Sequence, residues 1–172
     1  ACPKNMFTAT LHAKPYDSEE ACIAAVLHGE VKPGDAIFIR YEGPRGSGMP
    51  EMFYTTEAIS SDPELSASIA LLTDGRFSGA SKGPAIGHIS PEAAQGGPIA
   101  LIEENDLIEI DIPQRILRVV GINGEKCSEE EVQRVFNERR KALPPFKSRY
   151  THGVLKRFTQ TAHSPMQGGY MD

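Results

Sequence analysis

The clearest capacity for chemistry in this chain lies in the stretch T-D-G-R-F-S-G, residues 73–79, which directly follows an apolar run. A serine hydroxyl can act as a nucleophile or, as an alkoxide, as a base. Gly75 and Gly79 give the backbone freedom to turn its amides inward, and such a nest around Ser78 would stabilise an alkoxide or a carboxylate. The alternative is a tight surface turn in which Asp74 and Ser78 only cap backbone groups.

Two further residues beside Gly-rich segments could take part. Glu51, in the stretch G-M-P-E-M, offers carboxylate oxygens of the kind that Mg²⁺ prefers. A glutamate in the first turn of a helix, favoured by the helix dipole, is the alternative. His88 could act as a base toward Ser78 in a serine hydrolase, or as a structural hydrogen-bonding group. The chain has neither the G-x-S-x-G pattern of such hydrolases nor a phosphate-binding loop.

Composition excludes several classes of protein. With 172 residues, 40% hydrophobic and 24% charged, the chain is expected to fold as a single domain over 1–172. A net charge of −5 without a basic cluster argues against nucleic acid. The apolar runs are too short to cross a membrane, and the first residues lack a signal-peptide core, so we expect a cytoplasmic protein without a membrane partner.

The cysteines give no sign of a metal or disulfide site. Cys2, Cys22 and Cys127 are widely spaced and form no C-x-x-C pair, so neither a disulfide framework nor a zinc site is indicated. The chain also begins without Met. This start favours a processed fragment or an excised domain.

The elements that must position these residues alternate between helix and strand. A capping box from Asp17 to Glu20 predicts a helix that ends before Gly29. Apolar runs predict strands at 36–43 and 67–73. Between them we expect a flexible loop at 43–48, a helix over 49–59 with Pro50 near its first turn, and a turn at 61–66.

The second half adds strands and one long helix. We expect a strand at 96–102, a polar turn at 103–106, and an alternating strand at 108–112 that forms a hairpin with 116–121. A capped helix should run from Ser128 to about Leu143, where two prolines stop it, followed by an extended tail over 144–172.

This order of elements predicts an α/β fold, with a mixed sheet or small barrel flanked by helices. A strand that ends at Thr73 would place the loop with Ser78 at the carboxyl edge of the sheet, where ligands bind in such folds.

Four stretches together resemble one known family. They are G-P-R-G-S-G-M-P-E-M, T-D-G-R-F-S-G, the segment 86–113 and Y-T-H-G-V-L near the end. In this order and spacing they are similar to the C-terminal domain of the dihydroxy-acid and sugar-acid dehydratases, which include 6-phosphogluconate, xylonate and arabinonate dehydratases. The resemblance covers roughly 17–155 and implies a swivelling β/β/α domain, similar to the mobile domain of aconitase-like hydro-lyases.

The resemblance also implies an activity. Family members remove water from 2,3-dihydroxy carboxylic acids to give 2-keto acids, using Mg²⁺ and an iron–sulfur cluster, and they form dimers or tetramers. It assigns to Ser78 the role of the base that removes the C2 proton, and to Glu51 that of a Mg²⁺ ligand. Mg²⁺ would hold the carboxylate and the 2-hydroxyl, and an iron of the cluster would act as a Lewis acid on the departing 3-hydroxyl. The candidate substrate contacts are Arg76, Ser81, Lys82 and His163, and for the last three the alternative is a solvated surface position.

Departures from the family pattern set two further expectations. The cluster cysteines and most Mg²⁺ ligands of the family belong to a preceding N-terminal domain, so this chain alone is expected to be inactive. Ser47 stands where branched-chain dehydratases commonly have Pro, and the segment 60–68 is unusually polar. Both features favour a sugar acid as the substrate. The alternatives are a branched-chain dihydroxy-acid dehydratase, and a non-catalytic swivelling small subunit or binding module.

Overall fold

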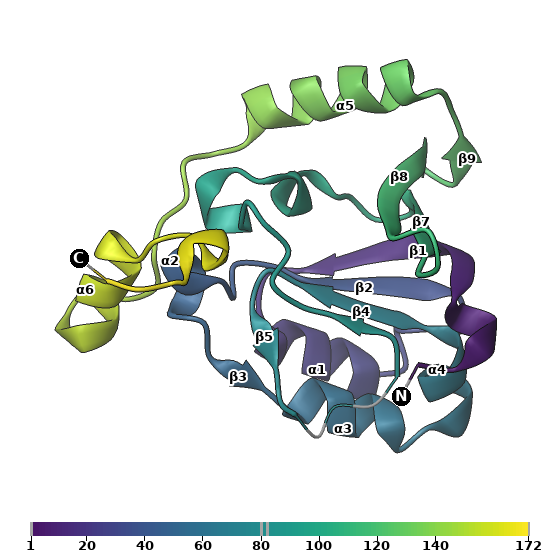
Figure 1. Ribbon diagram of the computed structural model, residues 1–172, viewed down its shortest axis with the longest axis horizontal. Helices are drawn as coiled ribbons and strands as arrows, with labels where there is room; N and C mark the ends of the chain where they lie inside the picture. Colours follow the sequence, from purple (N-terminus) through teal and green to yellow (C-terminus); the bar gives the residue numbers. More distant parts are fainter. Residues whose placement is uncertain (1, 80, 82, 172) are drawn as a thin grey trace.

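The structure is a computed structural model that describes residues 2–79, 81 and 83–171 (Figure 1). Its centre is an open sheet of seven strands in the order β6-β4-β2-β1-β7-β8-β9. The first four strands of this order pair in parallel, and β7, β8 and β9 join by antiparallel pairing. The strands are β1 (Thr8–Tyr16), β2 (Asp35–Ile39), β4 (Ala70–Thr73), β6 (Ala85–Ile86), β7 (Leu107–Asp111), β8 (Ile116–Ile122) and β9 (Glu125–Lys126).

Helices cover the two faces of this sheet. On one face lie α1 (Glu19–Leu27) and α3 (Tyr54–Ser60), with α4 (Pro63–Ser68) beside α3, and on the other lie the 3-10 helix η3 (Pro98–Leu101) and α5 (Glu129–Ala142) (Figure 1). The remaining short elements before the tail are η1 (Lys4–Met6), α2 (Pro44–Ser47), η2 (Ala93–Gln95) and a separate two-stranded sheet of β3 (Glu51–Met52) and β5 (Arg76–Phe77).

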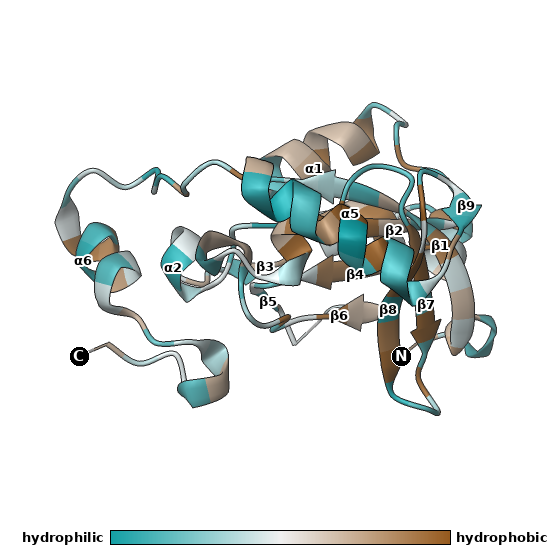
Figure 2. Cartoon of the chain, turned by 90° about the horizontal axis from the view of Figure 1, so that it is seen from above, coloured by the Kyte–Doolittle hydropathy of each residue, from teal (hydrophilic) through white to brown (hydrophobic). Residues whose placement is uncertain are grey.

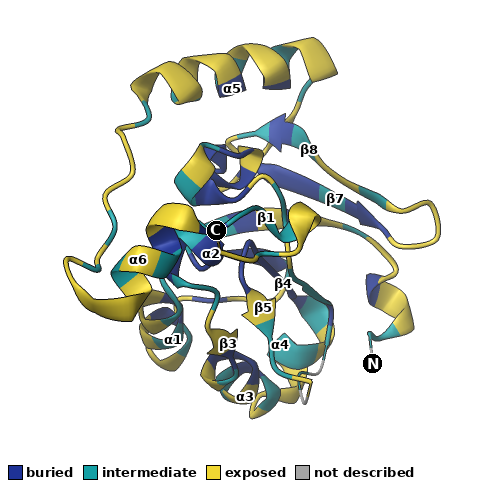
Figure 3. Cartoon of the chain, turned by 60° about the vertical axis from the view of Figure 1, so that its left-hand side comes forward, coloured by how far each residue is buried: buried dark blue, intermediate teal, exposed yellow. Residues whose placement is uncertain are grey.

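The central strands are apolar because both of their faces are covered. Every residue of β2 and of β4 is buried, as expected of parallel strands between two helical layers (Figure 3). Successive side chains of a strand point to opposite faces. Ile37 and Ile39 therefore join the core under α1 and α3, whereas Ala36 and Phe38 join the core under α5.

Helix α5 follows the predicted pattern. Ser128 caps it by accepting a hydrogen bond from the amide of Glu131 (3.2 Å), and Val132 and Phe136 are its buried residues. Figure 2 shows its outward face as mainly hydrophilic over the apolar strands. Arg139 ties the helix to the turn that precedes β7 by pairing with the buried carboxylate of Asp106 (2.5 Å).

The predicted fold class is confirmed. The chain forms an α/β structure with a mixed sheet flanked by helices, and the sheet stays open over the described residues, so the small-barrel alternative does not apply. The β7–β8 hairpin, the polar turn before it and the strand that ends at Thr73 lie where the sequence predicts them.

The segment around Glu51 differs from the prediction. Residues 43–48 contain the single helical turn α2, not a flexible loop, because Pro44 occupies its first position and Glu92 accepts hydrogen bonds from its amides. The predicted helix over 49–59 begins only at Tyr54. The residues before it form β3, because this segment pairs with β5.

Three other predictions need correction. The residues 61–66 contribute to the helix α4, which Asp62 caps at the amides of Glu64 (2.9 Å) and Leu65 (3.2 Å). The predicted strand 96–102 contains η3, which has no partner strand among the described residues. The cap of α1 is Ser18 and not Asp17, whose carboxylate pairs with Arg40 instead.

The tail is more structured than predicted. The segment after α5 contains α6 (Gly153–Thr161) and the 3-10 helix η4 (Pro165–Gln167). It folds back beside α2, so the C-terminal residues lie next to the loop that follows β2 (Figure 3).

Candidate active site

The loops that follow the parallel strands meet at the carboxyl edge of the sheet, where the sequence predicted a ligand crevice. Asp74, directly after β4, joins them. Its fully buried carboxylate accepts hydrogen bonds from the amides of Tyr41 (3.2 Å), Glu42 (3.0 Å) and Ala93 (2.8 Å). One side chain therefore holds the loops after β2, β4 and β6 together.

A second buried carboxylate, Glu92, holds α2. It accepts hydrogen bonds from the amides of Arg45 (3.0 Å) and Gly46 (2.9 Å), two of the amides that the first turn of a helix leaves without backbone partners. Gly46 is required here because a β-carbon at this position would lie 2.2 Å from the carbonyl oxygen of Tyr41. Glu92 thus holds α2 by hydrogen bonds, and the helix packs closely against the Tyr41 backbone at Gly46.

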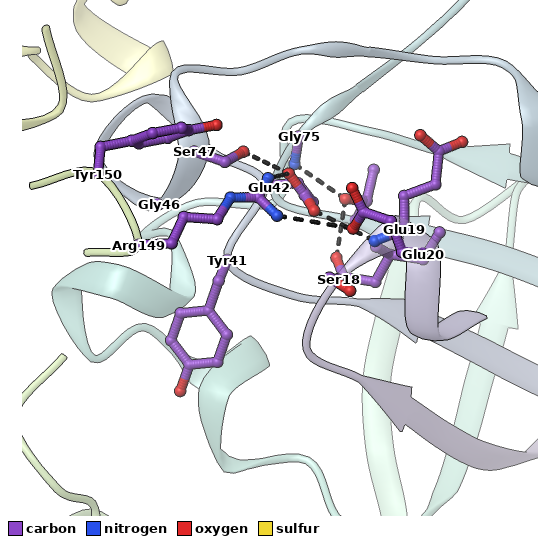
Figure 4. Close-up of polar contacts among 12 residues, drawn as sticks. Ser18, Glu19, Glu20, Tyr41, Glu42, Gly46, Ser47, Gly75, Arg149 and Tyr150 are labelled. Atoms are coloured by element: carbon purple, nitrogen blue, oxygen red, sulfur yellow. Dashed lines mark hydrogen bonds and ion pairs between the residues drawn. The ribbon is translucent and has the colours of Figure 1, made fainter. Parts of the chain in front are cut away.

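Glu42 is the third buried carboxylate of this edge. It accepts hydrogen bonds from the amide of Glu19 (3.1 Å), at the start of α1, and from the hydroxyl of Ser47, and it pairs with Arg149 of the tail (3.3 Å) (Figure 4). Burial raises the pKa of the Glu42 carboxyl, and the hydrogen bonds and the Arg149 charge oppose this shift. Burial likewise raises the pKa of Asp74 and that of Glu92, against their hydrogen bonds from backbone amides.

The β3–β5 ribbon brings three of the predicted site residues together. Glu51 pairs with Arg76 in register, and Ser78 follows β5 by one residue, with its amide donating to the carbonyl of Met52 (3.0 Å). Glu51 and Arg76 are exposed, while Ser78 is half-buried. Arg76 also donates from Nε to the carbonyl of Met49 (2.9 Å), so its side chain ties β5 to the segment that leads into β3.

The backbone around Ser78 differs from the predicted nest. The amide of Gly75 donates to the hydroxyl of Thr73 (2.9 Å), and the amide of Ser78 is used by β3, so neither points into an anion site. Gly75 is needed for close approach, since a β-carbon there would lie 2.7 Å from the carbonyl oxygen of Glu42. Asp74 caps backbone amides, as predicted by the alternative of a tight turn. The turn lies in the interior of the protein, however, and not on its surface.

The other predicted residues are not all gathered at this ribbon. The Ser81 hydroxyl is buried and makes no hydrogen bond within the described part of the chain, although its amide donates to the carbonyl of Ser78 (3.0 Å). Lys82 lies outside the described residues. His163 lies in the tail, where its ring stacks on Tyr170 with centroids 4.4 Å apart. The exposed imidazole of His88 makes no hydrogen bond among the described residues.

Sequence reasoning missed Glu42, Glu92 and Arg149. The first two have a recognisable signal, because each is an acidic residue beside Pro or Gly in a loop after an apolar strand. Arg149 has no such signal. It is one of several basic residues in a tail that reaches Glu42 only through the tertiary fold.

The described residues do not form a metal centre by themselves. Among the described residues, no group of three or more His, Cys, Asp and Glu side chains could hold a metal ion. The cysteines do not form a set either, because Cys22 is a buried residue of α1 itself, in the core on that face of the sheet, whereas Cys2 and Cys127 contact the core on the other face. An iron–sulfur cluster does not fit these positions, and Glu51 could contribute one carboxylate to a Mg²⁺ site completed by other residues.

A cavity of about 670 Å³ lies elsewhere, between α5 and the sheet. Its lining is largely apolar and includes Phe38, Ile108, Val132 and Phe136, and none of the described predicted site residues lines it. No helix in the described ranges has the length and apolar character needed to cross a bilayer.

Comparison with known proteins agrees with this picture. The family described as "Dihydroxy-acid/6-phosphogluconate dehydratase C-terminal" matches residues 1–169. A dihydroxy-acid dehydratase of Methanosarcina barkeri is 50% identical over 161 residues, which are 93% of this chain and 27% of that protein. The dihydroxy-acid dehydratases of Methanothrix thermoacetophila (46% identical, 99% of this chain and 29% of that protein) and Nitratidesulfovibrio vulgaris (47% identical, 91% and 26%) are similar as well.

The chain spans about a quarter of the length of these curated relatives. The family match covers almost the whole chain and includes the loops that meet at the carboxyl edge of the sheet. This chain therefore belongs to the dihydroxy-acid/6-phosphogluconate dehydratase family and corresponds to its C-terminal region.

Proposed function

We propose that this chain is the C-terminal part of a hydro-lyase that converts a 2,3-dihydroxy carboxylic acid into a 2-keto acid, with Ser78 as the base. The observation that carries the proposal is the β3–β5 ribbon. It sets the carboxylate of Glu51 opposite Arg76 and leaves Ser78 one residue beyond, half-exposed at the edge where α/β folds bind ligands.

The chemistry requires such an arrangement. The proton at C2, next to a carboxylate, is weakly acidic, so its removal needs a strong base and stabilisation of the charge that develops. In the proposal Ser78 Oγ, present as the alkoxide, takes this proton and becomes the hydroxyl, and Arg76 supplies positive charge beside it toward the anionic substrate. The buried hydrogen bonds of Asp74 hold the turn that carries both residues, and such fixed positioning is worth several kcal/mol to a reaction.

The cofactors belong to the complete enzyme. Mg²⁺ would supply Lewis-acid chemistry, and in this chain only the exposed Glu51 is proposed to bind it. The iron–sulfur cluster and the remaining Mg²⁺ ligands are proposed to come from the three quarters of the relatives' length that this chain does not span. A cytoplasmic dimer or tetramer remains part of the proposal, and so does the inactivity of the isolated chain.

For the substrate, the comparisons favour the alternative over the expected sugar acid. The relatives described above are all named dihydroxy-acid dehydratases, and we therefore place a branched-chain dihydroxy acid first. The structure also removes one reason for expecting a sugar acid, since polar residues of 60–68 serve their own backbone. Asp62 caps α4, and the hydroxyls of Ser61 and Ser68 donate to the carbonyls of Ala58 and Glu64.

The test is a dehydration assay on the full-length protein, reconstituted with iron and sulfide without oxygen and supplied with Mg²⁺. Formation of 2-keto acid is followed from 2,3-dihydroxyisovalerate, xylonate, arabinonate and gluconate in parallel. We expect the highest kcat/KM with 2,3-dihydroxyisovalerate. A preference for a sugar acid would overturn the substrate order, and no product from any acid with the cluster present would favour the non-catalytic binding module.

A further inference from the structure

The C-terminal tail crosses the loop end of the sheet and contacts the loop after β2 at several points. The Phe146 ring stacks on Tyr41 with centroids 5.2 Å apart and planes at 7°. Arg45 donates from Nε to the carbonyl of Ala162 (2.8 Å). Tail and loop are therefore joined by stacking, by a hydrogen bond and by the contact of α6 with α2.

Arg149 is the part of the tail that reaches a buried charge. Its Nη2 lies 3.3 Å from Glu42 Oε2, and its Nη1 lies 3.6 Å from the exposed carboxylate of Glu20 (Figure 4). The side chain of Glu42 is only 2% exposed, whereas that of Glu20 is 75% exposed. The ion pair of Arg149 with Glu42 should therefore be stronger than its pair with Glu20, because water screens exposed ion pairs and makes them weak.

The backbone of Glu42 touches the turn that leads to Ser78. Its amide donates to Asp74 Oδ1 (3.0 Å), and its carbonyl oxygen leaves no room for a β-carbon on Gly75. Close-packed contacts of this kind transmit displacement, since they have no free space to absorb it. Only β5 separates Gly75 from Ser78.

We infer that Arg149 and Glu42 are positioning residues, which together let the C-terminal tail set the position of the turn that carries Ser78. The inference rests on the proposed function where it concerns catalysis. The ion pair draws the Glu42 side chain toward the tail, the Glu42 backbone holds Asp74 and Gly75, and these residues place β5 and Ser78.

The experiment compares variants of the full-length, cluster-loaded protein. Arg149→Gln removes the charge from a side chain that is 44% exposed, and Arg149→Lys keeps it. Glu42→Gln and the double variant complete a cycle. The matched control is Arg134→Gln, which breaks arginine–glutamate pairs on the exposed face of α5, far along the chain from this loop.

Two measurements are made on each variant. The first is kcat and KM for the preferred acid. We expect Arg149→Gln to lower kcat about 10- to 100-fold at nearly unchanged KM, because misplacing a reacting group costs rate in this range and spares ground-state binding. The second is hydrogen exchange of the amides in residues 71–79, which we expect to be faster in Arg149→Gln than in the parent.

Rescue and coupling distinguish positioning from a general loss of stability. Arg149→Lys should recover part of the lost kcat, and the double variant should be no worse than the poorer single variant, because the two residues act through one contact. If Glu42→Gln does not fold, the comparison of Arg149→Gln with Arg149→Lys still tests whether the Arg149 charge positions the turn.

The inference is overturned if Arg149→Gln matches the Arg134→Gln control in both kcat and exchange, or if the effects of the two substitutions on kcat are additive. A parent protein that dehydrates none of the acids tested would refute the proposed function instead. In that case the exchange of residues 71–79 still decides whether the tail controls the turn.

Discussion

Ser78 carries the largest single consequence of the proposed mechanism. Ser78→Ala removes the only group that we assign to the C2 proton, so turnover of the full-length enzyme should fall at least 10²- to 10⁴-fold, the usual contribution of a general base. The iron content and the melting temperature should stay close to those of the parent. The matched control is Ser60→Ala, which removes a hydroxyl bonded only to its own helix and should leave kcat unchanged. Retained turnover in Ser78→Ala would exclude Ser78 as the base.

The role of Glu51 can be tested through the Mg²⁺ dependence of the activity rather than through the maximal rate. Glu51→Gln keeps the shape of an exposed side chain and removes its charge, so the Mg²⁺ concentration for half-maximal activity should rise about tenfold or more, since carboxylate is the ligand that this ion prefers. Stability should change by less than about 0.5 kcal/mol. Glu57→Gln, at an exposed position of α3, is the control. Identical Mg²⁺ titrations for the two variants would make Glu51 a surface residue without a metal role.

At the scale of elements, the turn between β4 and β5 depends on the close approach of Gly75 to Glu42. Gly75→Ala places a methyl group 2.7 Å from the Glu42 carbonyl oxygen and should destabilise the fold by about 1–3 kcal/mol, the usual cost of overpacking. Gly79→Ala provides the matched control, because no described residue other than its chain neighbours lies within 4 Å of the added carbon. Urea unfolding of both variants measures the difference. Equal midpoints would mean that the turn relaxes without cost.

The sequence predicted the elements that depend on residues close together in the chain and missed those that depend on distant ones. The α5 cap at Ser128 and the β7–β8 hairpin depend on residues close together in the chain, and both were predicted. The strand β1 was not predicted, although Leu11 and Ala13 alternate with exposed or half-buried neighbours. Its role as the centre of the sheet depends on pairing with β2 and β7, far away in the chain.

The site shows the same division. Ser78 and Glu51 were singled out because they lie in recognisable stretches beside glycines, and their roles stay predictions, whereas the helix expected at Glu51 was wrong. A short ribbon forms there only because β5 lies alongside. The carboxylate of Glu42 pairs with Arg149, which lies 107 residues later in the chain, and no local sequence pattern predicts such a contact.

At the scale of the whole molecule, three buried carboxyls at one edge of the sheet make stability depend on pH. Burial raises the pKa of Glu42, Asp74 and Glu92 above their ordinary values. The folded state therefore binds protons more tightly at these sites than the unfolded state does. The contribution of each site to stability is greatest below the ordinary pKa and falls as pH rises through the folded value.

Glu92 allows this effect to be isolated, because Glu92→Gln removes one titrating group from the edge. The free energy of unfolding of the parent minus that of Glu92→Gln should grow as pH falls from 7 toward 4.5, the ordinary pKa of a glutamate. Urea unfolding at a series of pH values measures this difference. Glu130→Gln should show the opposite trend, since hydrogen bonds to its own backbone amide and to Ser128 lower the pKa of exposed Glu130. The opposite result would be a difference in unfolding free energy, parent minus Glu92→Gln, that becomes smaller toward acid pH. It would mean that hydrogen bonds from the amides of α2 stabilise the Glu92 carboxylate more than burial destabilises it.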